Sequence, residues 1–272
     1  MYQDHWKLNA MPFQNTPDPR FFYSSPQHDE ALARLLYAVH QKVGAAMLTG
    51  TFGCGKTLLG ETLLRALVGE KYKIAFIKNP KLDYIELLVA IVQELGGGKN
   101  LPSKKSDLVT TFVLNELKEI LMNNARDGSE TIIIIDEAHI MEDPSVLEGL
   151  RLLLNFQNND QFLLTLLLLG QPELKAHVSQ FKPLSQRISV KCHLDHLTAE
   201  EIRHYIDRRL QTAGRTEPIF TDEAIQSIFE HTGGIPRKIN TVCDLCLLSG
   251  FDKKATSIDR PIVQDVIREE MG

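Results

Sequence analysis

The stretch Gly50-Thr51-Phe52-Gly53-Cys54-Gly55-Lys56-Thr57 decides how this chain folds, and it reads G-x-x-x-x-G-K-T. It follows the short apolar run 45–49, which suits a buried strand. It precedes the segment 58–67, in which every fourth residue from Leu59 is a leucine, so that one face of a helix is apolar. A strand, a glycine-rich loop and a helix in this order are the context of a phosphate-binding loop.

Each part of this loop has a physical task. Glycines let the backbone turn so that successive N–H groups point toward phosphate oxygens. The N-terminus of the following helix adds a partial positive charge. We expect Lys56 to reach the β- and γ-phosphates and the Thr57 hydroxyl to ligate Mg²⁺. The predicted nucleotide-binding residues are Gly50, Thr51, Phe52, Gly53, Cys54, Gly55, Lys56, Thr57 and Leu58.

The composition is that of an ordinary globular protein. The 272 residues suffice for one large or two small domains, and 43% of them are hydrophobic. A net charge of −5 does not indicate a strongly basic nucleic-acid binder. The longest apolar run, 162–169, is far shorter than the ~20 residues of a membrane helix. Because the chain has four cysteines and its start lacks a secretory signal, we expect a cytoplasmic protein with no membrane segment.

Alternating strand and helix patterns predict a parallel, doubly wound sheet. The isoleucines at 132–135 are apolar on both faces, which is typical of a central strand. The other expected strands are 45–49, 74–79, 162–169 and 188–194. Helices are expected at 28–42, 58–67, 83–95, 107–125, with Ser106 as its cap, and 145–158. The fold class is therefore α/β, with five parallel strands and helices on both faces.

The chain changes character after residue 195, where helix signals continue and no strand pattern appears. A capping box opens a helix at Thr198, and prolines such as Pro236 stand at first-turn positions. Before residue 28, prolines and aromatic residues exclude a long helix. The predicted parts are an aromatic and proline-rich arm (1–27), an α/β nucleotide-binding domain (28–195) and a small all-helical domain (196–272).

Two adjacent carboxylates, Asp136 and Glu137, end the isoleucine strand. They repel each other, which argues for a cation between them and bound phosphates. Asp136 is predicted to hold the Mg²⁺ shell, and Glu137 to polarise an attacking water. His139 completes the string D-E-A-H, but no other helicase motif follows it. We therefore interpret His139 as a residue at the start of a helix.

These motifs together resemble the Walker A and Walker B motifs of the AAA+ ATPases, and more narrowly the ExeA/general secretion pathway protein A group. The resemblance covers nearly the whole chain. It is carried by His5-Trp6, Pro12-Phe13, 16–22, His28, Ala31-Leu32, 53–57, the string Gly-Gln-Pro-Glu-Leu at 170–174, Gln186-Arg187-Ile188 and 234–240. It implies a P-loop NTPase fold of the AAA+ type in which 196–272 form a helical lid.

The resemblance also implies roles for three further residues. Gln171 would be a first sensor that contacts the γ-phosphate or the lytic water; the alternative is a polar turn before Pro172. Arg187 would be an arginine finger acting on a neighbouring subunit, which requires a homo-oligomer; the alternative is a surface arginine. Arg237 would be a second sensor touching the γ-phosphate in cis; the alternative is a surface residue at a helix start.

Two groups of residues have both a functional and a structural interpretation. Phe13, Phe21 and Tyr23 would stack on adenine or, equally, fill the core of their own domain. Cys243 and Cys246 form a single C-x-x-C pair, which cannot build a closed zinc site, and we interpret them as helix core.

The implied function is Mg²⁺-dependent ATP hydrolysis by an accessory ATPase that assembles a secretion or pilus-type envelope machine. Proteins of that group typically continue into a membrane helix and an envelope-facing domain, so we expect a shortened form or a stand-alone relative. The alternative is a DNA-dependent ATPase regulating a transposase, similar to the MuB/TniB regulators. That role needs a basic track, for which Lys104-Lys105 and Lys253-Lys254 are thin support. A third alternative, a scaffold that binds ATP with little turnover, is opposed by the intact Lys56 and Glu137.

Overall fold

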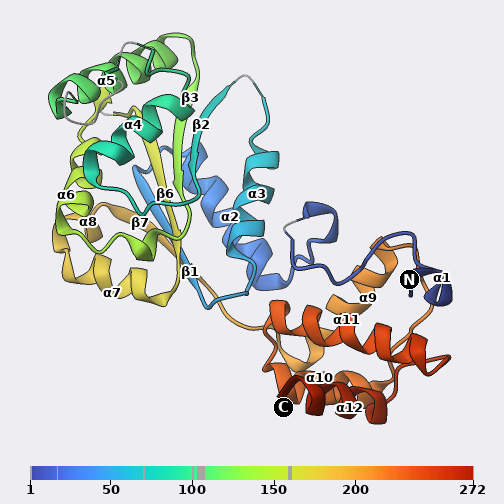
Figure 1. Cartoon of the computed structure of the whole chain (residues 1–272). Helices are drawn as coiled ribbons and strands as arrows, with labels where there is room; N and C mark the ends of the chain where they lie inside the picture. The colour runs from blue at the N-terminus through green and yellow to red at the C-terminus, as the bar shows by residue number, and fades with distance from the viewer. Residues whose placement is uncertain are drawn as a thin grey trace. The chain divides into compact units, whose positions relative to one another are not determined.

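The ribbon of Figure 1 is a computed structural model of the whole chain. It describes residues 2–16, 18–69, 71–99, 101–102, 108–158 and 161–271. The chain divides into two compact units. We call them the sheet unit (Asp29–Gly50 and Leu59–Leu194) and the arm–helix unit (Met1–His28, Thr51–Leu58 and Asp195–Gly272). This grouping places the loop 51–58 with the arm and the C-terminal helices, whereas the sequence assigned it to the α/β domain.

A five-stranded parallel sheet forms the centre of the sheet unit, in the order β2-β3-β6-β1-β7. Its strands are β1 (Ala45–Gly50), β2 (Tyr72–Ile77), β3 (Glu130–Ile135), β6 (Leu164–Gly170) and β7 (Ile188–Leu194). The isoleucine strand β3 is paired on both sides, as its apolar faces predict. The sequence did not predict the short antiparallel hairpin of β4 (Gln157–Asn158) and β5 (Gln161–Phe162).

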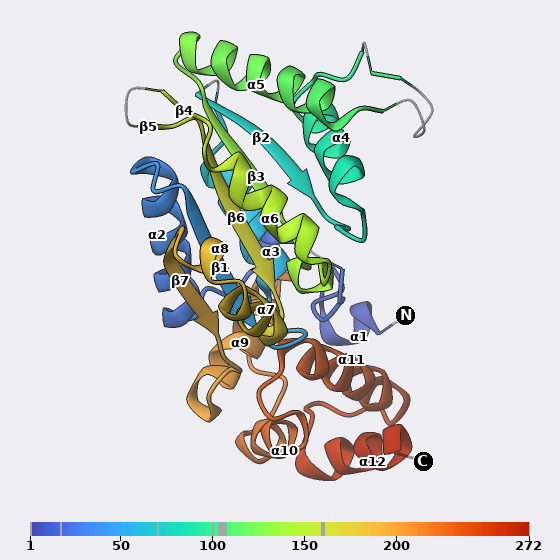
Figure 2. The ribbon, with the colours of Figure 1, turned by 90° about the vertical axis from the view of Figure 1, so that its left-hand side faces the viewer.

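Helices cover both faces of this sheet (Figures 1 and 2). One face carries α2 (Pro26–His40) and α3 (Lys56–Ala66), and the other carries α4 (Tyr84–Glu94), α5 (Thr110–Arg126) and α6 (Pro144–Leu153). The fold class predicted from the sequence is therefore confirmed. Helix α4 begins with a capping box between Asp83 and Glu86.

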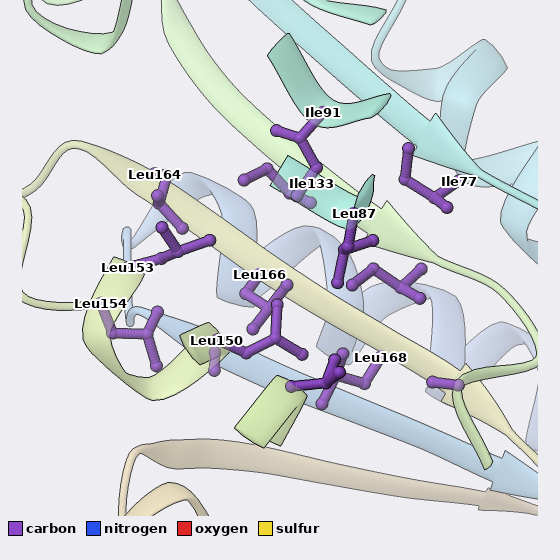
Figure 3. Packing of buried hydrophobic residues seen from close by; sticks show 14 of the residues in the cluster. Ile77, Leu87, Ile91, Ile133, Leu150, Leu153, Leu154, Leu164, Leu166 and Leu168 are labelled. Atoms are coloured by element: carbon purple, nitrogen blue, oxygen red, sulfur yellow. The ribbon is translucent and has the colours of Figure 1, made fainter. Parts of the chain in front are cut away.

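Along each strand, successive side chains point alternately into the two helix layers that cover the sheet. Ile133 and Leu166 point into the cluster that α4, α5 and α6 cover, shown in part in Figure 3. Their neighbours along the strands face the other layer, where a Cβ added to Gly60 of α3 would lie 3.0 Å from Leu169. Each fully buried aliphatic side chain of this kind stabilises the fold by about 1.5–3 kcal/mol.

Some predicted helix limits were wrong. Helix α6 ends at Leu153 and not near residue 158, because the chain turns into the hairpin that starts at β4. Two helices after β6 were missed, α7 (Pro172–Gln180) and α8 (Lys182–Ser185). The predicted cap Ser106 and helix start Asp107 lie outside the described residues. Within the described part of the chain, no helix combines the length and apolar character needed to cross a bilayer.

The arm–helix unit joins the N-terminal segment to the C-terminal helices in one core. Its elements are α1 (Gln3–Trp6), η1 (Pro19–Phe21), α9 (Ala199–Thr212), α10 (Asp222–Thr232), α11 (Pro236–Asp252) and α12 (Arg260–Met271). Thr198 caps α9 in the predicted capping box. Trp6 and Phe13 are buried in the same cluster as α9 to α12, and the Trp6 ring N–H donates to the Leu247 carbonyl (2.8 Å). The arm is thus part of the helical core.

A buried polar network holds the arm in that core. Arg209 of α9 is only 6% exposed. Its guanidinium donates to the carbonyls of Pro12 (2.6 Å) and Gln14 (3.0 Å) and to the Tyr205 hydroxyl (2.9 Å). Burial raises the pKa of Tyr205, so the phenol keeps its proton and donates to Asn240 Oδ1 (2.7 Å).

Candidate functional site

The carboxyl ends of the neighbouring strands β3 and β6 bring Asp136, Glu137 and Gln171 to one end of the sheet. In the register of the sheet, Thr49 lies opposite Gly170, and Ile135 lies opposite Leu168. In this register β3 ends two residues before β6; Asp136 follows β3, Gln171 follows β6, and β1 ends at Gly50. In parallel α/β sheets this edge is where ligands bind.

The phosphate loop between β1 and α3 needs its glycines. Gly53 (φ +80°) and Gly55 (φ +99°) adopt left-handed backbone conformations that other residues avoid. A Cβ at Gly53 would lie 2.9 Å from the Cβ of Arg237, and one at Gly55 would lie 3.2 Å from His28 Nε2. The loop thus needs glycine at both positions, for the backbone conformation and for the close approach of its neighbours.

Lys56, the first residue of α3, is buried at this loop and is only 5% exposed. Its ammonium donates to the Thr51 carbonyl (2.9 Å) and lies 4.0 Å from Cys54 Sγ. The Thr51 hydroxyl oxygen is also buried and has no hydrogen-bond partner among the described residues. A cation and an unsatisfied hydroxyl beside turned backbone amides fit the oxygens of a phosphate chain.

His28 is hydrogen-bonded to the backbone of the phosphate loop. It is 3% exposed, and its Nε2 lies 3.0 Å from the Cys54 carbonyl oxygen. A carbonyl only accepts, so Nε2 carries the proton, and Nδ1 accepts from the Ser25 hydroxyl at 2.7 Å. The sequence placed His28 only at a helix start. No spacing rule predicts this contact, because it depends on the fold of the arm.

A small open hollow of about 40 Å³ lies within the arm–helix unit beside the loop. Its walls include Phe21, Tyr23, His28, Cys54, Gly55, Leu58, Tyr205, Arg209 and Pro236. Of the three aromatic residues considered for base stacking, Phe21 and Tyr23 line this hollow. Phe13 does not, because it is packed edge to face against Phe220 in the core (6.0 Å between ring centroids).

Arg237 extends from the first turn of α11 next to the loop. Its guanidinium carbon lies 4.9 Å from the centre of the Phe52 ring, a cation–π arrangement on a ring that is 57% exposed. The structure therefore brings the predicted second-sensor residue together with the phosphate loop, within the same unit.

The two carboxylates after β3 have different environments. Asp136 is 3% exposed, and its Oδ1 accepts the backbone N–H of Glu137 (2.9 Å). The Asp136 N–H continues the strand pairing by donating to the Ile77 carbonyl (2.9 Å). Glu137 has a left-handed backbone (φ +51°) and a partly exposed side chain. A residue other than glycine in this conformation costs about 1–3 kcal/mol and is often found at functional sites.

His139 links Glu137 to Gln171. It lies in the 3-10 turn η3 (Ala138–Ile140), its Nδ1 is 3.4 Å from Glu137 Oε2, and its Nε2 is 3.0 Å from Gln171 Nε2. Gln171 occupies the N-cap position of α7, but its side chain makes no capping hydrogen bond. The interpretation of His139 as only a helix-start residue therefore missed both contacts, of which the one with Gln171 joins positions 32 residues apart in sequence.

Arg187 lies at the opposite end of the strands, where their amino ends are. It immediately precedes β7, where Ile188 pairs with Ala45 at the amino end of β1. The six residues of β1 separate that level from Gly50, which is roughly 17–20 Å at about 3.3 Å per residue. Arg187 donates to Asn155 Oδ1 (3.3 Å) and is not gathered with Asp136, Glu137 and Gln171.

The paired cysteines of α11 are core residues, as predicted. Cys243 and Cys246 are fully buried and unbonded. Burial raises the pKa of both thiols, that of Cys246 to about 12. Among the described residues, no three His, Cys, Asp or Glu side chains gather to form a metal site.

Comparison with known proteins identifies the family. A family model described as AAA domain matches residues 39–178, just over half of the chain. The chain is 38% identical over 261 residues to General secretion pathway protein A of Aeromonas hydrophila, covering 95% of this chain and 46% of that protein. It thus spans about half of that relative's length. It is 22% identical to ORC1-type DNA replication protein 1 of Halobacterium salinarum, covering 92% of this chain and 80% of that one.

The fold is also found in solved structures. The Aeropyrum pernix ORC2 protein, in its ADPNP–ADP complexes, superimposes with a TM-score of 0.68 at 18% sequence identity. The match covers 96% of this chain and 72% of that chain. The chain therefore belongs to the AAA domain family, and its fold is that of a P-loop NTPase of the AAA+ type.

Proposed function

We propose that this protein binds Mg-ATP and hydrolyses it to ADP and phosphate. The carrying observation is the loop 50–57, where left-handed glycines, the buried Lys56 ammonium and an unsatisfied Thr51 hydroxyl converge. Membership of the AAA domain family supports ATP as the nucleotide. The proposal also keeps the division into an arm (1–27), a nucleotide-binding domain (28–195) and a helical lid (196–272).

In this proposal the loop residues bind the phosphates and Lys56 contacts the β- and γ-phosphate oxygens. Thr57 and Asp136 would hold Mg²⁺, because a hydroxyl and a carboxylate supply the oxygen ligands that this ion prefers. When bound, Mg²⁺ would supply positive charge that stabilises the charge developing on the phosphates. Arg237 contacts the γ-phosphate from the lid. The Phe21 and Tyr23 side of the hollow receives the base.

Glu137 accepts a proton from the attacking water, and Gln171 orients that water or the γ-phosphate. The left-handed backbone of Glu137 supports this role, because strain of this kind persists where the position of a side chain matters.

Turnover of purified protein tests the proposal. Phosphate release should require Mg²⁺ and stop when EDTA removes it, while a fluorescent ATP analogue should bind and be displaced by ATP. Phosphate release that continues in excess EDTA, or a protein that binds no adenine nucleotide, would refute Mg-ATP hydrolysis.

We further propose that Arg187 completes the site of a neighbouring subunit in a homo-oligomer. Its position at the amino edge of the sheet supports action in trans, because the loop of its own chain follows the carboxyl edge. Mixing inactive Lys56→Ala subunits with inactive Arg187→Ala subunits should restore part of the turnover. If no mixing ratio restores activity, the finger role is wrong.

We propose the process that ATP hydrolysis would drive from the similarity to other proteins. The 38% identity to General secretion pathway protein A favours an accessory ATPase of a secretion or pilus-type envelope machine, acting from the cytoplasm. The similarity to an ORC1-type DNA replication protein favours the alternative, a DNA-dependent ATPase. The basic pairs support the alternative little: Lys253 is neutralised by Asp265 (2.6 Å), and Lys104-Lys105 lie outside the described residues.

A gel-shift assay separates the two roles. ATP-dependent binding to duplex DNA that falls steeply with salt would favour the DNA-dependent ATPase. The envelope role predicts no ATP-dependent shift between 50 and about 200 mM salt.

A further inference from the structure

The turn after β3 places an imidazole between two residues of the proposed hydrolytic site. A Cβ added to Gly170 would lie 3.1 Å from the His139 backbone nitrogen, so the turn packs tightly against the end of β6. The imidazole is therefore held beside Gln171, the residue that follows Gly170. On its other side it meets Glu137, two positions earlier in the same turn.

The hydrogen-bonding capacity of an imidazole links these two contacts. A neutral ring carries one proton, so one nitrogen donates while the other accepts. The Glu137 carboxylate only accepts, and its Oε2 lies 3.4 Å from Nδ1, so a hydrogen bond between them forms only when the proton is on Nδ1. Nε2 then accepts from the NH₂ group of Gln171 (3.0 Å). One tautomer satisfies both contacts.

The other tautomer releases Glu137. The backbone N–H of Gln171 also points to His139 Nδ1 at 3.4 Å, and it is satisfied only when Nδ1 has no proton. The proton then sits on Nε2, which faces the amide of Gln171 and needs its oxygen. The carboxylate of Glu137 would face a lone pair on Nδ1 and would be repelled. The orientation of the Gln171 amide thus selects the tautomer, and the tautomer decides whether Glu137 is held.

We propose that His139 is a positioning residue that couples the orientation of the Gln171 amide to the placement of the Glu137 carboxylate. The inference rests on the proposed function, because it gives Glu137 the water-activating role. A ligand oxygen that turned the Gln171 amide would change the hold on Glu137 without moving the backbone. His139 touches no reacting atom and does not bind the nucleotide.

Steady-state kinetics give the first test. The His139→Ala variant should lose turnover number by about tenfold or more, a size typical of residues that orient a functional group, while ATP affinity changes less than about twofold. The His139→Gln variant, whose amide can both donate and accept, should recover part of the loss. In the Glu137→Gln background, His139→Ala should reduce the residual turnover no further. The control His177→Ala removes a histidine of α7 outside this chain of contacts and should leave turnover unchanged.

The tautomer gives a second test that does not depend on activity. In protein labelled with ¹⁵N-histidine, the Nδ1 and Nε2 resonances of His139 should report a proton on Nδ1. In Gln171→Ala the tautomer populations should shift toward Nε2–H. Unchanged populations in that variant would overturn the coupling.

The outcomes also separate this inference from the proposed function. Wild-type turnover in His139→Ala, together with loss of turnover in Glu137→Gln, would overturn the role of His139 and leave the proposed hydrolysis intact. Wild-type turnover in Glu137→Gln would overturn both. Retained ATP affinity in each variant shows that it has folded.

Discussion

The two units of this protein hold their cores together in different ways. The cluster around Leu166 in the sheet unit consists of apolar side chains from strands and helices (Figure 3). The core of the arm–helix unit surrounds the guanidinium of Arg209, which fixes the carbonyls of Pro12 and Gln14. Apolar packing is non-directional, whereas each of these hydrogen bonds selects one partner. The arm has little regular structure, and these hydrogen bonds therefore fix which of its residues lie against α9.

The residues with proposed roles are distributed over both units. The loop 51–58 and Arg237, which would bind the nucleotide, belong to the arm–helix unit. Asp136, Glu137 and Gln171, which would support hydrolysis, belong to the sheet unit. Substitutions in the two units should therefore have separable effects on affinity, turnover and local stability.

The largest expected effect is on the apolar core. Leu166→Ala in β6 should lower the free energy of unfolding by about 2–5 kcal/mol, because it leaves a cavity among fully buried side chains. Urea unfolding measures the loss, and amide exchange should accelerate first in β1, β3 and β6. A loss below about 1 kcal/mol would mean that the core collapses around the cavity.

The second largest effect is expected from removing the Lys56 ammonium of the phosphate loop. Lys56→Ala should weaken ATP binding about 100-fold, since hydrogen bonds to a charged group contribute about 1.5–3 kcal/mol and a tenfold change in affinity is about 1.4 kcal/mol. Calorimetric titration measures the affinity. An affinity within about threefold of the wild type would contradict the assignment of Lys56 to the phosphates.

The buried network of the arm should give a smaller loss. Arg209→Leu leaves the carbonyls of Pro12 and Gln14 without their donor, which should cost about 2 kcal/mol of unfolding free energy. Exchange should rise in residues 8–16 more than in the sheet. The matched control is Arg208→Leu at the adjacent, exposed position, which should change stability by less than about 0.5 kcal/mol. An equal loss of unfolding free energy in both variants would refute the role of Arg209 in holding the arm.

The smallest effect concerns Phe52. Its ring holds Arg237 at 4.9 Å, and an exposed cation–π contact is worth about 0.5–1 kcal/mol. If Arg237 must leave the ring to contact phosphate, Phe52→Ala should tighten ATP binding by up to about fivefold. Weakening by more than about tenfold would instead mean that the ring itself contacts the nucleotide.

The same contrast explains what the sequence predicts well. The strand around Ile133 and the helix beginning at Lys56 depend on local periodicity and on one motif, so they can be read from neighbouring residues. The carboxylates at 136–137 follow from the position at which a strand ends. The roles of these residues remain predictions, but their places in the fold are as expected.

What the sequence does not predict depends on distant partners. Arg209 contacts Pro12 across 197 positions, and His139 contacts Gln171 across 32. The local sequence around Arg209 or His139 does not predict which distant residue it contacts. Likewise, Phe13 has an apolar, aromatic character that suits a base pocket and a core equally well. Only the packing against Phe220 decides for the core.

Comparison of the wild type with Glu137→Gln, in turnover and in affinity, tests the central claim most directly. The substitution keeps the size of the side chain and removes its ability to accept a proton. Phosphate release should fall by about 100-fold or more, the usual contribution of a general base, while ATP affinity stays within about twofold. Turnover at the wild-type rate, with ATP bound normally, would contradict the assignment of hydrolysis to Glu137.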